Sequence, residues 1–345
     1  MLRSVLPQPL SLVLEDVEIP TPAPGEVVIR VRAVTLCGSD VRVWKGEKTG
    51  GVAWPATIGH EVAGEVAAIG DGVDSHRVGD RVALAPWFTC GECVHCRSGV
   101  TNLCDAMEVF AYGIAGALAE YAVIPALGVA NGQLVTTTGT VPWEIAALAE
   151  PLACVYHGHS RSRISEGSSV LIIGGGPIGL LHLELAVLAG ATTVIVSEPS
   201  AQRREFALQH GATATVDPTS ESLADVVASA TGGRGVDTTI VCIGHGALVA
   251  EAIELTSKGG LINLFAGFGG DGLASVPLNT IHYRQQDVIG NSGATLDDYL
   301  YAVELIESGR IDLDDYITDR FPLAELRAAL ERATSGDAIK VAVIC

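Results

Sequence analysis

The sequence lacks any apolar run long enough to cross a membrane. Its most apolar stretch, residues 170–196, is interrupted by three consecutive glycines, His182 and Glu184. Because a membrane-spanning helix needs about 20 consecutive apolar residues, no such helix is predicted. The N-terminal segment carries prolines and acidic residues instead of the apolar core of a signal peptide. We therefore expect a cytoplasmic protein, in which structural disulfides are rare.

Positive charge is also scarce. Lysine and arginine number 21 against 40 aspartates and glutamates, which gives a net charge of −19 at pH 7. Such an acidic surface repels phosphate backbones and anionic lipid headgroups. We therefore exclude nucleic acid and membrane as partners and favour a small-molecule substrate.

Apolar residues are abundant, at 48% of the 345 residues, whereas charged residues make up 18%. This balance excludes disorder as the dominant state. The length favours about two domains, each large enough to bury a core without disulfides.

The pattern changes near residue 141. Before it, short apolar runs at 27–34, 62–70 and 80–84 predict a barrel-like, largely antiparallel region. After it, strands and helices alternate, which is typical of an α/β doubly wound parallel sheet. The expected helices are at 143–160, 178–188, 201–210, 248–255, 296–306 and 323–333, and the expected strands at 169–173, 193–197, 239–242, 261–264 and 338–344.

A glycine-rich turn follows the first strand of this second part and opens a helix. It fits the pattern G-x-G-x-x-G and comprises Gly174, Gly175, Gly176, Pro177, Ile178 and Gly179. Gly174 permits the tight turn, Gly176 lets the backbone approach a pyrophosphate, and Gly179 allows close helix packing. We predict a dinucleotide site; the alternative is a glycine turn without a ligand.

Glu198 ends the next strand, where a carboxylate accepts hydrogen bonds from the adenosine ribose hydroxyls. The same charge repels a 2′-phosphate, so NAD is favoured over NADP. Arg203 and Arg204 follow closely and offer a phosphate site, which leaves NADP as the alternative.

Four cysteines lie within 15 residues: Cys90, Cys93, Cys96 and Cys104. Four thiolates at this spacing wrap one tetrahedral Zn²⁺, and without an open coordination position such a site is structural. Two disulfides or an iron–sulfur cluster are the alternatives.

A second set of metal-binding residue types lies in the first part of the chain. Cys37, His60 and Glu61 offer a thiolate, an imidazole and a carboxylate, the mixture that suits catalytic zinc. Taken singly, Cys37 would be an inert buried thiol and His60 a hydrogen-bonded interior histidine.

Together these features resemble the zinc-dependent medium-chain alcohol dehydrogenase family over essentially the whole chain. The resemblance rests on the cysteine lobe, the glycine turn, Cys37 and the His60-Glu61 pair, in the family's order and spacing. It implies a zinc- and NAD-dependent enzyme that oxidises a secondary alcohol to a ketone. A cofactor-binding protein without redox turnover, or a repurposed lyase, is the alternative from another class.

The resemblance also implies the domain organisation. A mostly β, GroES-like, partly barrel catalytic domain would comprise 1–146 and 285–345, with the structural zinc lobe at about 88–106. A Rossmann dinucleotide-binding domain would comprise 147–284. Cofactor domains of this family commonly pair through sheet edges, so we expect a homodimer or homotetramer with its contact near an edge strand at 260–269.

In this family Cys37 and His60 match the catalytic zinc ligands. Glu61 matches a carboxylate that ligates zinc or moves on and off it. Ser39 matches the hydroxyl that passes the substrate proton toward solvent, and Asp40 the acid that orients the zinc-bound histidine.

Glu150 matches the position of a third protein ligand. Glutamate there is the pattern of the sorbitol and threonine dehydrogenase branches, where it binds zinc directly or through a water. Cys154, one helical turn later, does not match that position.

Residues 102–104 and 320–323 look like the polyol branch. Residues 291–294 lack the Arg-Tyr pair with which sorbitol-type enzymes hold substrate hydroxyls, so we favour a cyclitol, an amino-sugar alcohol or another ring-bound secondary alcohol. A threonine-type or simple alcohol dehydrogenase is the alternative. Phe110 and Tyr112 belong either to a substrate pocket or to the core, and His182 is expected at a helix surface.

Overall fold

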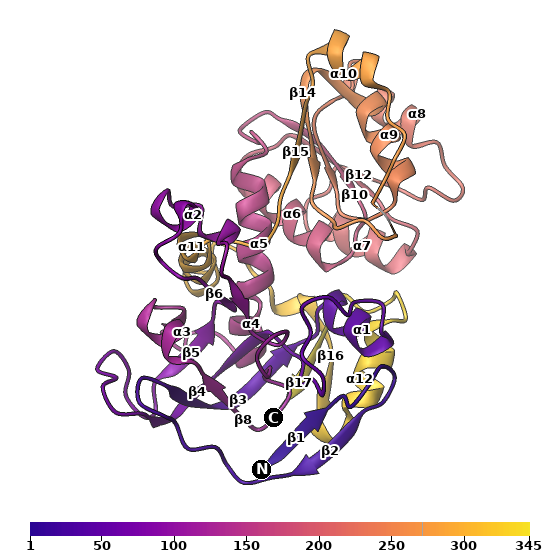
Figure 1. Ribbon diagram of the computed structural model, residues 1–345. Helices are drawn as coiled ribbons and strands as arrows, with labels where there is room; N and C mark the ends of the chain where they lie inside the picture. The colour runs from indigo at the N-terminus through magenta and orange to yellow at the C-terminus, as the bar shows by residue number, and fades with distance from the viewer. Residues whose placement is uncertain (271) are drawn as a thin grey trace. The chain divides into compact units, whose positions relative to one another are not determined.

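The chain folds into two units, and the computed structural model describes residues 1–270 and 272–345 (Figure 1). The first unit comprises Met1–Ala153 and Gly293–Cys345, and the second comprises Cys154–Ser292. The chain enters the second unit inside a helix, α5 (Ala149–Ser160), because that helix begins in the first unit. The boundaries expected from the sequence, 146/147 and 284/285, lie N-terminal to these positions.

The second unit is built on a six-stranded sheet in which every pairing is parallel. Its order, β12-β11-β10-β13-β14-β15, starts in the middle and winds outward in both directions. The predicted doubly wound fold is therefore confirmed. The strands are β10 (Ser169–Ile173), β11 (Thr193–Ser197), β12 (Ala214–Val216), β13 (Val236–Val241), β14 (Thr256–Leu264) and β15 (Asp287–Gly290).

Helices cover both faces of this sheet, which is why the central strand β10 is buried along its whole length. One face carries α8, α9 and α10, which share a hydrophobic cluster with Leu171 and Ile173 of β10 (Figure 1). Elsewhere in the unit, Phe265 contacts His182 of α6 and lies close to Gly158 of α5. The helices are α6 (Pro177–Leu188), α7 (Ala201–Gln209), α8 (Leu223–Thr231), α9 (Gly246–Leu255) and α10 (Leu278–Arg284).

Strand β14 is not an edge strand. It pairs with β13 on one side and with β15 on the other, so the expectation of a sheet edge near residues 260–269 is wrong. The error arises from β15, which is short and has a glycine and an aspartate at its ends, so that the sequence pattern does not mark it as a strand. Among the described residues the outer strands are β12 and β15.

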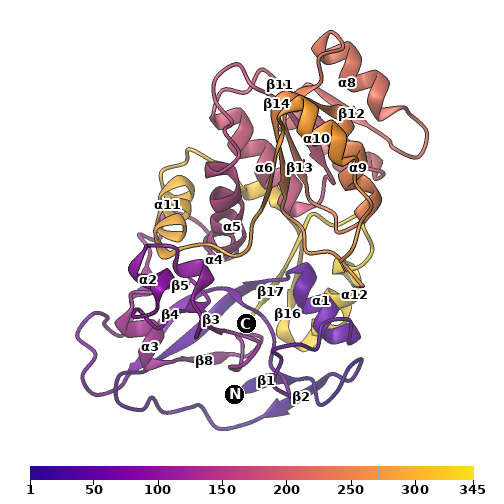
Figure 2. The same cartoon turned by 45° about the horizontal axis from the view of Figure 1, so that its top comes forward.

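The first unit is mostly antiparallel β structure. Its main sheet has the order β16-β17-β3-β4-β5-β9, with β8 also paired to β3, and only β16 and β17 run parallel. Because β17 pairs with β3, the C-terminal segment completes a sheet begun near the N-terminus (Figure 2). The strands are β1 (Leu2–Val5), β2 (Val13–Asp16), β3 (Val27–Thr35), β4 (Glu61–Ile69), β5 (Arg81–Leu84), β6 (Trp87–Phe88), β7 (Glu108–Val109), β8 (Tyr121–Ile124), β9 (Leu134–Thr136), β16 (Ile317–Pro322) and β17 (Lys340–Ile344).

Helices of this unit are mostly short. They are α1 (Gly38–Lys45), α2 (Val94–Arg97), α3 (Ala126–Ala130), α4 (Trp143–Ala147), α11 (Leu296–Glu307) and α12 (Leu326–Ala333), with 3₁₀ turns at Thr101–Leu103, Asp314–Tyr316 and Leu323–Glu325. The helix predicted at 143–160 is divided into α4 and α5. Pro151 lacks the N–H that an unbroken helix would bond to the carbonyl of Ala147, and it lies instead in the first turn of α5, where N–H groups have no partner within the helix.

His182 is buried, contrary to the expected surface position. Its ring meets Phe265 edge to face at a centroid distance of 4.7 Å, and neither ring nitrogen bonds to any described residue. Burial, with a smaller effect of His159, lowers the pKa of His182 well below 6.5. Burial also lowers the pKa of His159 to about 4. Both imidazoles are therefore neutral in the folded protein at pH 7.

Acid is expected to destabilise the protein through these histidines. In the unfolded chain each takes up a proton below about pH 6.5, whereas the folded pKa is lower, so stability falls as the pH drops. At about pH 5 the penalty is about 2 kcal/mol per histidine relative to about pH 7.5. We expect denaturant unfolding of His182→Leu to lose about 2 kcal/mol less than wild type over this range. The exposed His282→Leu is the control, and a pH dependence equal to wild type for His182→Leu would contradict the prediction.

Candidate functional site

Cys37, His60 and Glu61 meet where strands β3 and β4 lie side by side. In this antiparallel pair Thr35, the last residue of β3, is opposite Glu61, the first residue of β4. Cys37 follows β3 as the N-cap of α1, and His60 directly precedes β4, so the register brings both to one end of the pair. Their ligand atoms lie within 4.8 Å of one another. Sulfur, nitrogen and oxygen donors at one point suit a zinc ion.

Asp40 holds this group in place from α1. Its carboxylate is buried, accepts hydrogen bonds from the N–H groups of Cys37 and Gly59, each at 3.0 Å, and lies 3.4 Å from Nδ1 of His60. Burial would raise the pKa of Asp40, but His60 and these hydrogen bonds lower it below its usual value. Burial would lower the pKa of His60, but Asp40 and Cys37 raise it well above 6.5. Asp40 therefore fixes the orientation of the imidazole.

Ser39 follows Cys37 by two residues in α1, and an aromatic ring lies near His60. The Ser39 oxygen is shielded from solvent and bonds to no described residue. A buried polar atom without a partner can be satisfied by a bound ligand. The Tyr112 ring lies 5.8 Å from that of His60. Phe110, in contrast, is fully buried in the core of the first unit. The two aromatic residues therefore differ in role: Phe110 belongs to the core, whereas Tyr112 lies near His60.

Glu61 has two partners that sequence reasoning missed. One carboxylate oxygen accepts a hydrogen bond from Lys340 Nζ at 2.6 Å, and the other accepts one from the Thr35 hydroxyl. The Lys340 and Glu61 side chains are only 4% and 0% exposed. Burial would lower the pKa of Lys340, but the charges of Glu61 and Cys37 raise it above its usual value. The available signal was a lysine in the otherwise apolar β17; nothing in the sequence marks its partner.

Glu150 lies outside this three-residue group. It is buried in the first turn of α5. Burial raises the pKa of Tyr299 well above its usual value, and the Glu150 charge raises it further. The same charge contributes to the raised pKa of Lys340. Glu150 is therefore within electrostatic reach of the Lys340–Glu61 pair, whereas Cys154 belongs to neither metal-binding group in the described residues.

The second candidate metal group is the cysteine lobe, Cys90, Cys93, Cys96 and Cys104. These thiols are free, and the Cys90 sulfur lies 3.5 Å from that of Cys104 and 4.0 Å from that of Cys96. Sulfurs bonded at about 2.3 Å to one tetrahedral ion lie about 3.8 Å apart, whereas a disulfide needs about 2.05 Å. Hydrogen bonds from the N–H groups of Cys96 and Asp105 lower the pKa of Cys93 to about 6. The lobe fits one metal ion rather than two disulfides.

The glycine turn joins β10 to α6. Gly174 has a φ of +103°, where side chains are strained, and a Cβ on Gly179 would lie 1.8 Å from the Gly174 carbonyl oxygen. Gly176 is the N-cap of α6, and Pro177 and Ile178 are its first residues. No described side chain caps this helix, so its first N–H groups are available to an anion.

Glu198 directly follows β11 and turns back onto this turn. Its carboxylate accepts hydrogen bonds from the N–H groups of Gly175 and Ser200, each at 2.9 Å. The Arg203 guanidinium flanks the turn, 3.8 Å from the point that a Cβ on Gly176 would occupy. Arg204 is engaged elsewhere: it donates to the carbonyls of Glu198 and Pro199 and lies 3.4 Å from an Asp217 oxygen.

Comparison with known proteins gives one consistent result. An alcohol dehydrogenase GroES-like domain matches residues 23–133, and a zinc-binding dehydrogenase domain matches residues 177–308. The chain is 36% identical to L-threonine 3-dehydrogenase of Pyrococcus abyssi, over 89% of this chain and 87% of that protein. It is 31% identical to sorbitol dehydrogenase of Bacillus subtilis, over 96% and 93%.

A solved structure agrees with these relatives. A Sinorhizobium meliloti protein assigned as a zinc-binding dehydrogenase, with NADP bound, superposes with a TM-score of 0.92 at 33% identity, over 100% of this chain and 99% of that one. Among the described residues, no helix has the length and apolar character of a membrane span.

Proposed function

Because this chain belongs to the zinc-dependent medium-chain alcohol dehydrogenase family, we propose that it oxidises a secondary alcohol of a polyhydroxylated substrate to the ketone, with NAD as the hydride acceptor. Membership of this family establishes that the chain is an oxidoreductase that acts on alcohols. What we propose is its substrate class, its cofactor and the roles of its site residues. The observation that carries this proposal is the convergence of Cys37, His60 and Glu61, with the unpartnered Ser39 hydroxyl two residues after Cys37 in the chain.

We assign the catalytic zinc to Cys37 and His60, with Glu61 and Glu150 as further ligands, directly or through water. Zinc held there would supply Lewis-acid chemistry and lower the pKa of a substrate hydroxyl. We assign a second, structural zinc to the lobe formed by Cys90, Cys93, Cys96 and Cys104. The fit of both groups rests on their donor types and on the spacing of the sulfurs.

The protein's own residues then have distinct tasks. Ser39 takes the proton of the substrate hydroxyl and passes it toward solvent, which its unpartnered oxygen supports. Asp40 keeps the His60 ring in one orientation. Lys340 and Thr35 hold the Glu61 carboxylate in place.

The dinucleotide is assigned to the turn at 174–179, with Glu198 and Arg203 beside it. The pyrophosphate would meet the uncapped N-terminus of α6, and the ribose hydroxyls would bond to Glu198. NAD is favoured because Arg204, the second arginine near the turn, is already paired with Asp217. The NADP of the Sinorhizobium meliloti structure makes NADP the alternative.

Replacing Glu198 with alanine is expected to reduce the preference for NAD over NADP by about tenfold, because the charge that repels a 2′-phosphate is lost. The ratio of kcat/KM for the two cofactors measures it. Glu205→Ala is the matched control, since Glu205 lies on the adjacent helix α7 and bonds to Gln209. An unchanged ratio in Glu198→Ala would remove Glu198 from cofactor selection.

For the substrate, the absent Arg-Tyr pair favours a cyclitol or an amino-sugar alcohol over sorbitol. Similarity to L-threonine 3-dehydrogenase supports the threonine alternative. A homodimer or homotetramer and a cytoplasmic location are also proposed. Light scattering of the purified protein checks the first, and fractionation of the source cells checks the second.

The test is NADH or NADPH formation with linear polyols, cyclitols, amino-cyclitols, L-threonine and simple secondary alcohols, each with and without a chelator. We expect chelator-sensitive oxidation of a cyclic polyhydroxy substrate with NAD⁺ and about two zinc ions per chain by metal analysis. Preference for L-threonine would favour the alternative. Absence of any turnover in zinc-loaded protein that binds NADH would reject the proposal in favour of a non-redox role.

A further inference from the structure

A cavity of about 360 Å³ lies entirely within the first unit. Tyr112 forms part of its wall, and the ring of the same residue lies 5.8 Å from the His60 ring. Lys48 and Glu108 also line it, and the remaining lining residues are apolar or glycine. The volume is within the range of small-molecule sites, about 300–1,000 Å³. It is therefore large enough for a small substrate, and Tyr112 is the residue that connects the cavity to His60.

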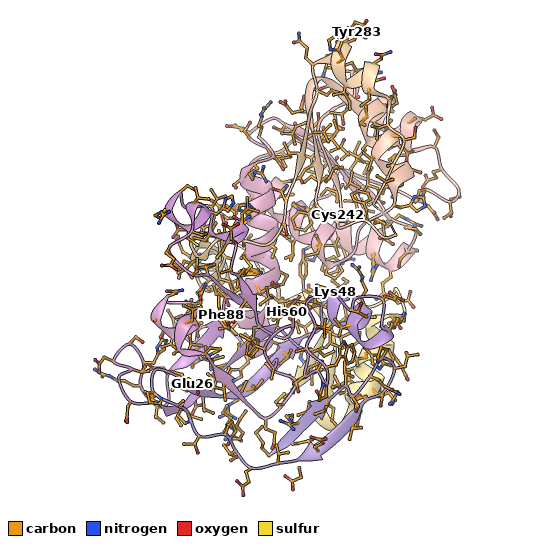
Figure 3. All side chains as sticks on the ribbon, viewed as in Figure 1. Glu26, Lys48, His60, Phe88, Cys242 and Tyr283 are labelled. Atoms are coloured by element: carbon orange, nitrogen blue, oxygen red, sulfur yellow. The ribbon has the colours of Figure 1, made fainter. Side chains whose placement is uncertain are left out.

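Lys48 is the cation of this cavity. Its ammonium lies 3.8 Å from the centroid of the Tyr112 ring, which places it no more than about 10 Å from the centre of the His60 ring (Figure 3). Among the described residues Lys48 forms no ion pair, and it does not pair with Glu108 across the cavity. The aromatic face holds the ammonium in position without neutralising it.

We propose that Lys48 binds an anionic group, a carboxylate or a phosphate, on the alcohol that this enzyme oxidises. The inference rests on the proposed function and adds the substrate class. The chain carries a net charge of −19 and only four lysines, so its general field repels anions. An unpaired ammonium in a largely apolar cavity offsets that repulsion at one point. The substrate hydroxyl then lies at the Cys37–His60–Glu61 group and the anion at Lys48.

The test compares Lys48→Gln with wild type on matched pairs that differ only in the anionic group: galactitol and galactonate, myo-inositol and an inositol monophosphate, L-threoninol and L-threonine. We expect wild type to prefer the anionic member. In Lys48→Gln, KM for that member should rise about 10- to 100-fold, because a charge-assisted hydrogen bond is lost, while kcat/KM for the neutral member is unchanged within about threefold. The carboxylate and phosphate pairs distinguish the two sources of charge.

Three variants separate recognition from structure. Lys48→Arg keeps the charge and the ring contact and should retain the preference. Lys48→Glu should invert it. Lys45→Gln is the matched control, because Lys45 is an exposed lysine three residues away that does not line the cavity. Added salt should weaken binding of the anionic member in wild type and not in Lys48→Gln.

Calorimetric binding of both members to the same proteins separates this inference from the proposed function. Lys48-dependent binding of the anion without turnover would reject the proposed reaction and retain the inference. Equal use of neutral and anionic members by wild type, an unchanged ratio in Lys48→Gln, or no Lys48-dependent binding would overturn the inference and leave the dehydrogenase assignment intact.

Discussion

Replacing Cys37 with serine is expected to lower kcat about a thousandfold or more, while NADH binding changes less than about threefold. The thiolate is the soft donor of the Cys37–His60–Glu61 group, and a serine hydroxyl is neutral at pH 7 and a poor zinc ligand. Without zinc the substrate hydroxyl keeps a pKa far above neutrality, which costs several kcal/mol in the barrier. Cofactor binding is spared because the glycine turn and Glu198 belong to the other unit.

The matched control is Cys154→Ser. Cys154 lies one helical turn beyond Glu150 and belongs to neither metal-binding group in the described residues, so its loss should leave kcat near wild type. Metal analysis supplies the second readout: Cys37→Ser should lose about one zinc per chain and keep the one in the cysteine lobe. Near-normal activity of Cys37→Ser with both zinc ions retained would contradict the assignment.

The chemistry that could be predicted from the sequence is carried by residues close together in the chain. The cysteine lobe spans Cys90 to Cys104 and the glycine turn spans 174–179, so spacing alone indicates a metal and a phosphate group. The alternation of strands and helices predicted the doubly wound sheet. Pairing of β3 with β4 explains why the more distant Cys37 and His60 meet, since both flank the same end of two adjacent strands.

What could not be predicted depends on contacts between distant segments. Lys340 reaches Glu61 because β17 pairs with β3, and no local sequence pattern predicts that pairing. His182 appears polar in sequence, yet α6 is covered on that side by Phe265. The edge position of β15 likewise follows from tertiary packing, as does the difference between the fully buried Phe110 and the partly buried Tyr112.

Replacing Lys340 with methionine is expected to lower the free energy of unfolding by about 3–5 kcal/mol. Methionine has a side chain of similar length, so the packing is nearly preserved. The loss of stability would then come from removal of the positive charge. Glu61 would be left as a carboxylate with 0% exposure and no cation within hydrogen-bond distance. Urea unfolding of the metal-loaded and the metal-stripped protein separates this loss from any loss of zinc.

A double variant shows whether the charge or the packing is responsible. In Lys340→Met combined with Glu61→Gln no ion is buried, and the Thr35 hydroxyl can still donate to the amide oxygen, so most of the stability should return. Activity should stay low, because the carboxylate of the metal-binding group is gone. Stability and activity therefore respond differently to the same pair, which a merely structural ion pair would not produce.

Arg234→Met is the matched control for the burial argument. Arg234 pairs with Asp237 at 2.6 Å, the same distance as in the Lys340–Glu61 pair. The side chains of Arg234 and Asp237, however, are 59% and 37% exposed. Water replaces the lost partner at such a site, so the change should stay below about 1 kcal/mol. If Lys340→Met were as mild as Arg234→Met, the buried pair would not contribute the expected stability. Lys340 would then not be what holds the Glu61 carboxylate in the metal-binding group, and its fixed position would depend on Thr35 alone.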